Sequence, residues 1–196
     1  MSKHILIIDG HPDAKAEHYV HALSSAYRDG ARTGGHQVRG IVVSELWFPL
    51  LRTCEDFKSG IPIETVRKAQ DWLEWADPVV ILFPLWLGSM PALLKGFLEQ
   101  VLRPGFAFAT TQWRLFPRRK LLAGKSARII VTMGMPAWFY RWYFGAHSLK
   151  SLKRNVLRSC GLNPVRACLV GTVETMSQAA RGSWLLKVQR LGARAR

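Results

Sequence analysis

The sequence predicts a doubly wound α/β fold, in which a five-stranded parallel sheet is covered by helices on both faces. Short apolar runs without polar alternation recur along the chain, and this pattern is typical of parallel strands buried on both sides. Segments with apolar residues at helical spacing lie between these runs. Such alternation implies parallel strands joined by right-handed crossovers. We therefore expect the strand order 2-1-3-4-5.

The predicted elements follow one another along the chain. The clearest strand is Val79–Phe83, which ends at Pro84. Pro91 then stands where a proline suits the first turn of a helix, and this helix should run to about Leu102. Residues 44–63 read as a long connection. The other predicted strands are His4–Asp9, Gln37–Val43, Ala127–Met133 and Val165–Val170, and the other predicted helices are a segment from Tyr19 to the glycines of Gly30–Gly35, Thr65–Ala76 and Leu149–Cys160.

Length and composition indicate one domain. A chain of 196 residues with 48% hydrophobic content suits a single domain with a substantial core, which we expect to span residues 1–196 with a basic amphipathic tail over residues 175–196. The three cysteines, Cys54, Cys160 and Cys168, are widely spaced and form no CxxC motif, so they favour a reducing compartment. The first residues do not resemble a signal peptide, and no apolar run reaches the roughly 18 residues of a membrane span. We expect a cytoplasmic protein.

Positive charge is concentrated in the second half of the chain. Residues 1–99 hold 10 basic and 12 acidic side chains, whereas residues 100–196 hold 18 basic and one acidic. Such a surface attracts dinucleotide phosphates, an anionic membrane leaflet or an acidic partner. The sequence shows no basic recognition helix, so we do not expect nucleic acid to be the partner. Residues 182–196 combine apolar residues at helical spacing with basic ones. We expect this stretch to lie outside the catalytic core, as an amphipathic segment against a partner subunit or an anionic surface; the alternative is that its apolar face covers its own subunit.

Three motifs stand in order around the third strand. They are Phe83–Leu85 (FPL), Pro91–Gly96 (PALLKG) and Gly105–Phe108 (GFAF). In these motifs the chain resembles the flavodoxin-like NAD(P)H:quinone oxidoreductases, the DT-diaphorase-like family. The resemblance extends from Ile5 to about Glu174. It implies a flavodoxin-like fold, a bound flavin with FAD favoured over FMN, NAD(P)H as co-substrate, and a homodimer with its sites at the interface.

The resemblance also implies where the flavin lies. Backbone N–H groups at the start of a helix attract phosphate, so the loop after the first strand should hold the flavin pyrophosphate. His11 matches the family there, whereas Ala16, Glu17 and His18 depart from the usual residue types and leave mainly backbone contacts. The alternative for His11 is a cap of the turn. The ring should lie against Pro84, Leu85, Trp86, Leu87 and Gly88, although the family's Trp stands one place later than Trp86, and its edges should be wrapped by Thr132, Met133, Gly134 and Met135.

Family members follow the fourth strand with a Tyr and a His that relay charge. Tyr140 or Tyr143, with His147, stand at nearly that distance here and are the candidate catalytic residues. An imidazole can take up or release a proton near neutral pH. The alternative is that these aromatic residues form a hydrophobic lid or dimer contact. His18 and His21 share a helix face without a third ligand, so we predict no metal site.

The predicted function is two-electron reduction of quinones or similar acceptors. In the ping-pong mechanism that the resemblance implies, hydride passes from NAD(P)H to the flavin, and a quinone then takes the nicotinamide's place to receive it. The alternative is a non-catalytic or weakly catalytic ancillary subunit that docks on a membrane transport protein. Either function allows peripheral contact with the inner face of a membrane.

Overall fold

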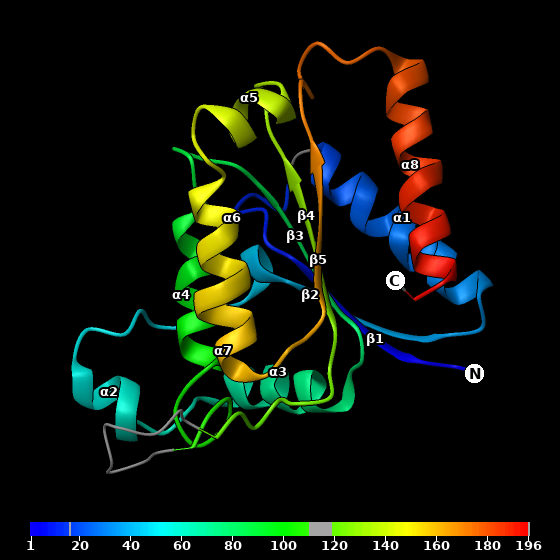
Figure 1. The fold of residues 1–196 in the computed structure, drawn as a ribbon. Coiled ribbons are helices and arrows are strands. Elements are labelled where there is room, and N and C mark those ends of the chain that lie inside the picture. Colours follow the sequence, from blue (N-terminus) through cyan, green and yellow to red (C-terminus); the bar gives the residue numbers. More distant parts are fainter. Residues whose placement is uncertain (16, 110–118, 196) are drawn as a thin grey trace.

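A five-stranded parallel sheet with helices on both faces forms the protein in the computed structural model, which describes residues 1–15, 17–109 and 119–195 (Figure 1). The strand order is β2-β1-β3-β4-β5, with parallel pairing throughout, as predicted. The strands are β1 (His4–Asp9), β2 (Gln37–Val42), β3 (Val79–Pro84), β4 (Ala127–Thr132) and β5 (Val165–Val170). The helices are α1 (Tyr19–Thr33), α2 (Cys54–Ser59), α3 (Glu64–Trp75), α4 (Ala92–Val101), α5 (Ala137–Trp142), α6 (His147–Ser151), α7 (Arg158–Cys160) and α8 (Gln178–Ala193).

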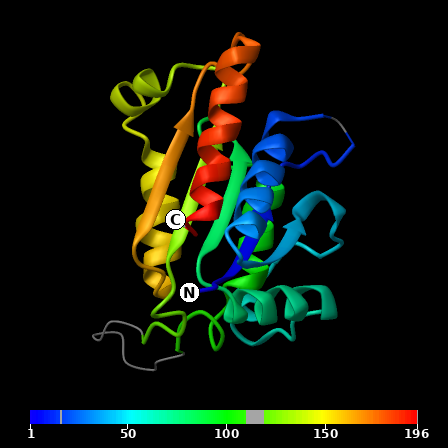
Figure 2. The ribbon, with the colours of Figure 1, turned by 90° about the vertical axis from the view of Figure 1, so that its right-hand side faces the viewer.

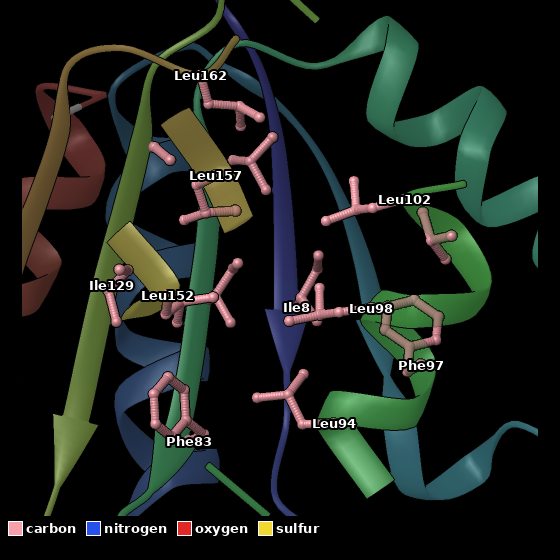
Figure 3. Packing of buried hydrophobic residues seen from close by; sticks show 14 of the residues in the cluster. Ile8, Phe83, Leu94, Phe97, Leu98, Leu102, Ile129, Leu152, Leu157 and Leu162 are labelled. Atoms are coloured by element: carbon pink, nitrogen blue, oxygen red, sulfur yellow. The ribbon is translucent and has the colours of Figure 1, made fainter. Parts of the chain in front are cut away.

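Two hydrophobic clusters lie on opposite faces of the sheet. Side chains alternate along a strand, so Leu6 and Ile8 of β1 point to one face and Ile5 and Ile7 to the other. The helices α3, α4, α6 and α7 cover the first face, and α1 and α8 cover the second (Figures 1 and 2). Figure 3 shows the first cluster, where leucines of α4 lie beside the strands.

Helix α4 begins one residue later than predicted. Pro91 is its N-cap, with an extended ψ of 145°, and its carbonyl oxygen accepts the N–H of Lys95 at 3.1 Å. The predicted helix over Leu149–Cys160 also differs. It begins at His147 and contains a π-helical segment, Leu152–Leu157, between α6 and α7.

The predicted long connection over residues 44–63 contains a short helix, α2, that the sequence analysis did not assign. Thr53 accepts the N–H of Asp56 at 3.0 Å, and the Asp56 carboxylate accepts the N–H of Thr53 at 3.2 Å. This reciprocal pair is a capping box, which satisfies two N–H groups that a helix start leaves open. A short 3-10 turn, Val43–Glu45, precedes it.

The C-terminal helix belongs to the body of the protein. Val188 is fully buried, and Trp184 and Leu191 pack against the cluster that α8 shares with α1. The two helices approach closely at glycines: a Cβ on Gly30 would lie 1.9 Å from the Gln189 carbonyl oxygen. The expectation that the apolar residues of this stretch face a partner subunit or an anionic surface was therefore wrong, and the alternative, that they cover their own subunit, holds. The predicted amphipathic pattern is weak in α8, because Trp184, Val188 and Leu191 face inward while Leu186 is 54% exposed.

Across the described ranges, no helix combines the length and the hydropathy needed to cross a membrane.

Candidate active site at the carboxyl edge of the sheet

Loops that follow β1, β3 and β4 meet at the edge where these parallel strands end. The N–H of Leu85 donates to the carbonyl oxygen of Thr132 at 2.7 Å, which joins the loop after β3 to the end of β4. The Trp86 ring meets the His11 ring edge to face, with centroids 6.1 Å apart, which joins the same loop to the one after β1. Ligands of open α/β sheets bind at this edge. The structure thus brings together the predicted His11, Leu85, Trp86 and Thr132.

Three imidazoles gather in the loop after β1 and at the start of α1. The ring of His11 is buried and stacks on that of His18, with centroids 3.7 Å apart. His18 Nε2 lies 3.2 Å from Asp13 Oδ2, and His21 Nδ1 lies 2.7 Å from Asp9 Oδ2. The second ring nitrogen of His21 lies 2.9 Å from the Asp13 carbonyl oxygen. We call His11, His18 and His21 the histidine cluster.

Members of the histidine cluster are electrostatically different. Burial lowers the pKa of His11, and the neighbouring imidazoles lower it further. The hydrogen bond with the Asp13 backbone acts to raise it. His11 Nδ1 lies 3.1 Å from the Asp13 backbone nitrogen and 3.0 Å from the Asp13 carbonyl oxygen, so it can accept from the first when unprotonated or donate to the second when protonated. For His21, burial acts to lower the pKa, but the hydrogen bonds to Asp9 and Asp13 and their charges raise it overall. His21 is thus the member that favours the charged form.

The start of α1 is open to an anion. His18 is its N-cap residue, and among the described side chains none caps this end and none in its first turn is acidic. The first N–H groups of a helix have no partner within it, so they attract negative charge together with the half-buried His18 ring. Glu17 is exposed beside it. Ala16, predicted to contact phosphate, lies outside the described residues.

The loop after β3 is a tight turn with an unusual backbone. Trp86 and Ser89 exchange backbone hydrogen bonds of 2.8 and 2.9 Å, and Leu87 and Gly88 between them have φ of 46° and 76°. Positive φ at both central positions defines a type I′ turn, and for a leucine it is strained by roughly 1–2 kcal/mol. The Leu87 side chain is fully exposed. Pro84, at the end of β3, leads into this turn.

The loop after β4 presents backbone groups more than side chains to a ligand. Thr132 and Met133 are buried, and Met133 packs in the core, so its side chain cannot face a ligand. Met135 also packs against this core, and Gly134 is exposed. A Cβ on Gly134 would lie 3.1 Å from a carboxylate oxygen of Glu174.

The three candidate catalytic residues have different surroundings. Tyr140 is buried, and its hydroxyl lies 2.7 Å from the Ser148 hydroxyl, so it anchors α5 to α6. Tyr143 is exposed and stacks on Phe139. His147 is exposed at the start of α6. Within the described residues no hydrogen bond or ring contact joins Tyr143 or His147 to the loop after β3. Both residues therefore remain candidates to contact a ligand that lies between them and this loop.

A groove runs between α4 and the helices α6 and α7. At the carboxyl edge it opens into a cavity of about 450 Å³, bounded by Trp86 and Leu87 on one side and by Ser148 and Leu152 on the other. A larger cavity of about 890 Å³ continues toward α2 and α7, and both are lined by Lys95. The smaller cavity is the one that adjoins the predicted flavin loop.

A flavin fits the groups at this edge. Within the described residues, the amides of Leu87, Gly88, Gly134 and Met135 donate to no carbonyl oxygen of the chain. These amides lie in the two loops expected to face the ring, and backbone N–H groups are suitable donors to its carbonyl oxygens and nitrogens. The open start of α1 suits the phosphates.

A sequence profile of the family described as having a flavodoxin-like fold matches residues 3–189. The chain belongs to this flavodoxin-like family. An uncharacterized NAD(P)H oxidoreductase of Haemophilus influenzae is 27% identical over 180 residues, which cover 90% of this chain and 87% of that protein. Human ribosyldihydronicotinamide dehydrogenase [quinone] is 37% identical over 90 residues, 46% of this chain and 38% of its own length. The ancillary protein KefG of a glutathione-regulated potassium-efflux system from Enterobacter is 38% identical over 86 residues, 44% of this chain and 40% of its own.

Solved structures agree with the flavodoxin-like fold. Smu.1420 from Streptococcus mutans superposes with a TM-score of 0.81 at 27% identity, covering 97% of this chain and 98% of that one. An NAD(P)H:quinone oxidoreductase from Methanothermobacter marburgensis also gives 0.81, at 21% identity over the full length of both. An FMN-dependent NADH-azoreductase from Bacillus anthracis, solved with FMN, gives 0.75 at 18% identity and covers 99% of both chains. The predicted family and fold are thus confirmed.

Sequence reasoning missed part of the histidine cluster. His21 was considered only as a metal ligand, and Asp9 only as a strand residue. Within the described residues no group of three or more His, Cys, Asp or Glu side chains is arranged to hold a metal ion. The spacing of His18 and His21 on one helix face was the available signal, but the contact of His21 with Asp9 depends on how α1 packs beside β1.

Proposed function

We propose that this chain is a flavin-dependent NAD(P)H oxidoreductase that reduces quinones by two electrons. The observation that carries the proposal is the meeting of the loops after β1, β3 and β4, through the Trp86–His11 ring contact and the Leu85–Thr132 hydrogen bond, beside an apolar cavity. The Haemophilus oxidoreductase, which is similar along most of both chains, supports this reaction class.

Each part of the site has a role in this proposal. The open start of α1 and His18 bind the flavin phosphates, and Trp86 and the amides of Leu87 and Gly88 bind and orient the ring. The amides of Gly134 and Met135, which donate to no carbonyl oxygen among the described residues, bind the other edge of the ring. When bound, the flavin supplies hydride transfer between the nicotinamide and the quinone. His147 holds or releases the proton that balances the charge, with Tyr143 as a second donor.

NAD(P)H and the quinone would occupy the same cavity in turn, giving ping-pong kinetics. The motif resemblance favours FAD as the flavin, whereas the structurally similar azoreductase holds FMN. We place the protein in the cytoplasm, because its cysteines form no CxxC motif or disulfide framework. We further propose a homodimer, in which a second copy covers part of the groove beside α4 and completes the site.

Flavin reconstitution tests the proposal most directly. Purified apoprotein titrated with FAD or FMN should give a yellow complex that binds tighter than about 100 μM, which corresponds to roughly −5.5 kcal/mol. Trp86→Ala should weaken binding, while Trp47→Ala, which removes an exposed tryptophan from the connection after β2, should not. Failure of both flavins to bind would refute the proposed function.

His147 can be tested by stopped-flow reduction with NADPH or NADH. We expect His147→Ala to slow flavin reduction by roughly ten- to a thousandfold, at or below the usual contribution of a general acid or base. His4→Ala removes an exposed imidazole at the opposite edge of the sheet and serves as the matched control. An unchanged rate in His147→Ala would remove the residue from the mechanism.

A second candidate function is that of an ancillary subunit on a membrane transport protein. The match to KefG over 44% of this chain and the basic second half favour it. Turnover discriminates between the two, because an ancillary role without catalysis predicts flavin binding but little steady-state quinone reduction.

A further inference from the structure

Five aromatic residues gather on and just after α5, and most of their surface is open. Trp138, Trp142 and Tyr143 are 68%, 79% and 67% exposed, and Phe144 is 40% exposed. Phe139 is half-buried at the centre, with ring contacts to Trp138, Tyr143 and Phe144 at centroid distances of 5.1–5.8 Å. We call these five residues the α5 aromatic cluster. Apolar side chains concentrated in this way on a protein surface mark an interaction site.

The inner side of α5 fixes the position of this cluster through contacts with α6. Tyr140 points inward from the same helix, is 1% exposed, and its hydroxyl meets the Ser148 hydroxyl at 2.7 Å and accepts the Leu149 N–H at 3.4 Å. Because Tyr140 anchors the inner side of α5, Trp138 and Trp142 are left on its outer side. In Figure 1, α5 stands at one end of the molecule, beyond the carboxyl ends of β4 and β5.

The charge around the cluster is positive. Arg141 on α5 and Lys150 on α6 are exposed, and the segment from α5 to α7 contains no acidic residue. Every ion pair between described residues lies among residues 3–99, so these cations are not neutralised by a neighbouring carboxylate. A second copy of this face would bring like charges together, whereas an anionic surface would be attracted.

We propose that the α5 aromatic cluster docks on an anionic lipid bilayer. Tryptophan and tyrosine favour the boundary between headgroups and acyl chains, where their apolar bodies are buried and their polar atoms stay wet. Each nearby Lys or Arg adds electrostatic attraction to anionic lipid. Aromatic insertion and basic attraction together supply the two signals that stable peripheral binding requires.

Docking there would place the candidate active site against the membrane. Helix α5 is joined through the Tyr140–Ser148 contact to α6, whose Ser148 lines the cavity that begins at Trp86 and Leu87. Leu87 is fully exposed on the rim of this cavity and extends the apolar surface. A bilayer-dissolved, long-chain quinone could then enter from the lipid. This choice of substrate rests on the proposed function, whereas bilayer binding itself does not.

Vesicle co-sedimentation tests the docking surface. The proteins are the wild type, the double variant Trp138→Ser/Trp142→Ser, and the control Trp47→Ser, whose tryptophan is 75% exposed elsewhere. Wild type and control should sediment with vesicles of phosphatidylcholine and phosphatidylglycerol, less with phosphatidylcholine alone, and less at high salt. The double variant should partition at least about tenfold more weakly. Circular dichroism and light scattering verify its fold and mass.

Two outcomes would overturn the proposal. One is a wild type that ignores anionic vesicles, or a double variant that binds them as well as the wild type does. The other is a double variant that loses dimer mass while the wild type binds no vesicles, which would assign the cluster to a second copy of the chain.

Turnover with a short-chain, water-soluble quinone keeps the two proposals separable. Without vesicles, the double variant should match the wild type with this substrate, whereas with a long-chain quinone in anionic vesicles it should be about tenfold slower. If no protein reduces the soluble quinone, the proposed function fails while vesicle binding still decides the docking surface. Equal rates on the long-chain quinone would refute entry from the lipid.

Discussion

The helices α5 and α8 both carry tryptophan and basic residues, yet the chain buries the apolar side of only one. In α8, Val188 is fully buried and Trp184 packs beside it against α1. In α5, Trp138 and Trp142 remain exposed. The difference lies in the neighbouring element: α1 offers α8 a close helix surface, whereas among the described residues no element covers the outer side of α5. An apolar pattern predicts that one side of a helix will be buried, but it does not predict which element or partner will cover that side.

The close approach of α8 to α1 is the strongest test of this comparison. A Cβ on Gly30 would lie 1.9 Å from the Gln189 carbonyl oxygen, so Gly30→Ala must push α8 away from α1. We expect the free energy of unfolding to fall by about 3 kcal/mol, measured by denaturant titration. Gly182→Ala is the matched control, since a Cβ on this α8 glycine has open space, and it should raise stability by about 0.5–1 kcal/mol. Equal effects would mean that the glycine contact does not hold α8.

Truncating one apolar side chain on each helix sharpens the same contrast. Val188→Ala should lower the free energy of unfolding by about 2 kcal/mol, because the residue is fully buried. Trp142→Ala should change it by less than about 0.5 kcal/mol, because its side chain is 79% exposed. If Trp142→Ala proves the more destabilising in thermal or denaturant unfolding, α5 is covered in solution by a stable contact of the folded protein.

The contrast recurs within α5 and the residue that follows it. Tyr140→Phe removes the hydroxyl that meets Ser148 and should lower the free energy of unfolding by about 1 kcal/mol. Tyr143→Phe removes an exposed hydroxyl and should leave the unfolding midpoint unchanged. The same two proteins can be assayed for flavin reduction. There, a slower Tyr143→Phe with unaltered stability would assign the tyrosine role to Tyr143.

The stability that α1 contributes through its first turns, beside the site, should depend on pH, whereas the contribution of its glycine contacts with α8 should not. The pKa of folded His21 lies above the ordinary value of 6.5. Its protonated form therefore stabilises the fold fully below about pH 6.5, and this contribution is lost as pH rises through the higher folded pKa. His21→Gln keeps a donor for Asp9 but not the charge, so it should cost a fraction of a kcal/mol more at about pH 5.5 than at about pH 8.5.

Denaturant unfolding at both pH values measures this effect. Asp9, Asp13, His11 and His18 all face His21 and are present in both proteins, so the difference between the wild type and His21→Gln reports the loss of this one imidazole. Burial lowers the pKa of His11, so in both proteins this residue makes the free energy of unfolding rise with pH, which is opposite to the effect of His21. A cost that is larger at high pH would contradict the assignment.

Prediction from the sequence succeeded where the determinant is local. The strand Val79–Phe83 and the turn that follows it were readable because apolar runs and proline act within a few residues. Helix α2 was also readable in principle, since Thr53 and Asp56 have capping-box spacing. Helix α5 was missed because its aromatic residues show no stripe facing one side, and only Tyr140 of its aromatic residues is fully buried.

The candidate site was predicted loop by loop but not as an arrangement. His11 and Trp86 were singled out separately, and their ring contact follows from β1 and β3 being neighbours in the sheet. Tyr140 was a catalytic candidate by position, yet its hydroxyl faces Ser148 in the core. Sequence spacing sets how far along the chain a side chain lies, not whether it points inward.

The sequence by itself determined the strands, their parallel order, the family and the loops at which a ligand should bind, because hydrophobic period and short motifs act over neighbouring residues. Only the tertiary structure decided which apolar helix sides are covered, which of the candidate side chains are exposed, and that His21 meets Asp9. These outcomes depend on contacts between residues far apart in the chain. The close fit of Gly30 against α8 is one such contact, and within the described residues the aromatic side of α5 has no comparable partner.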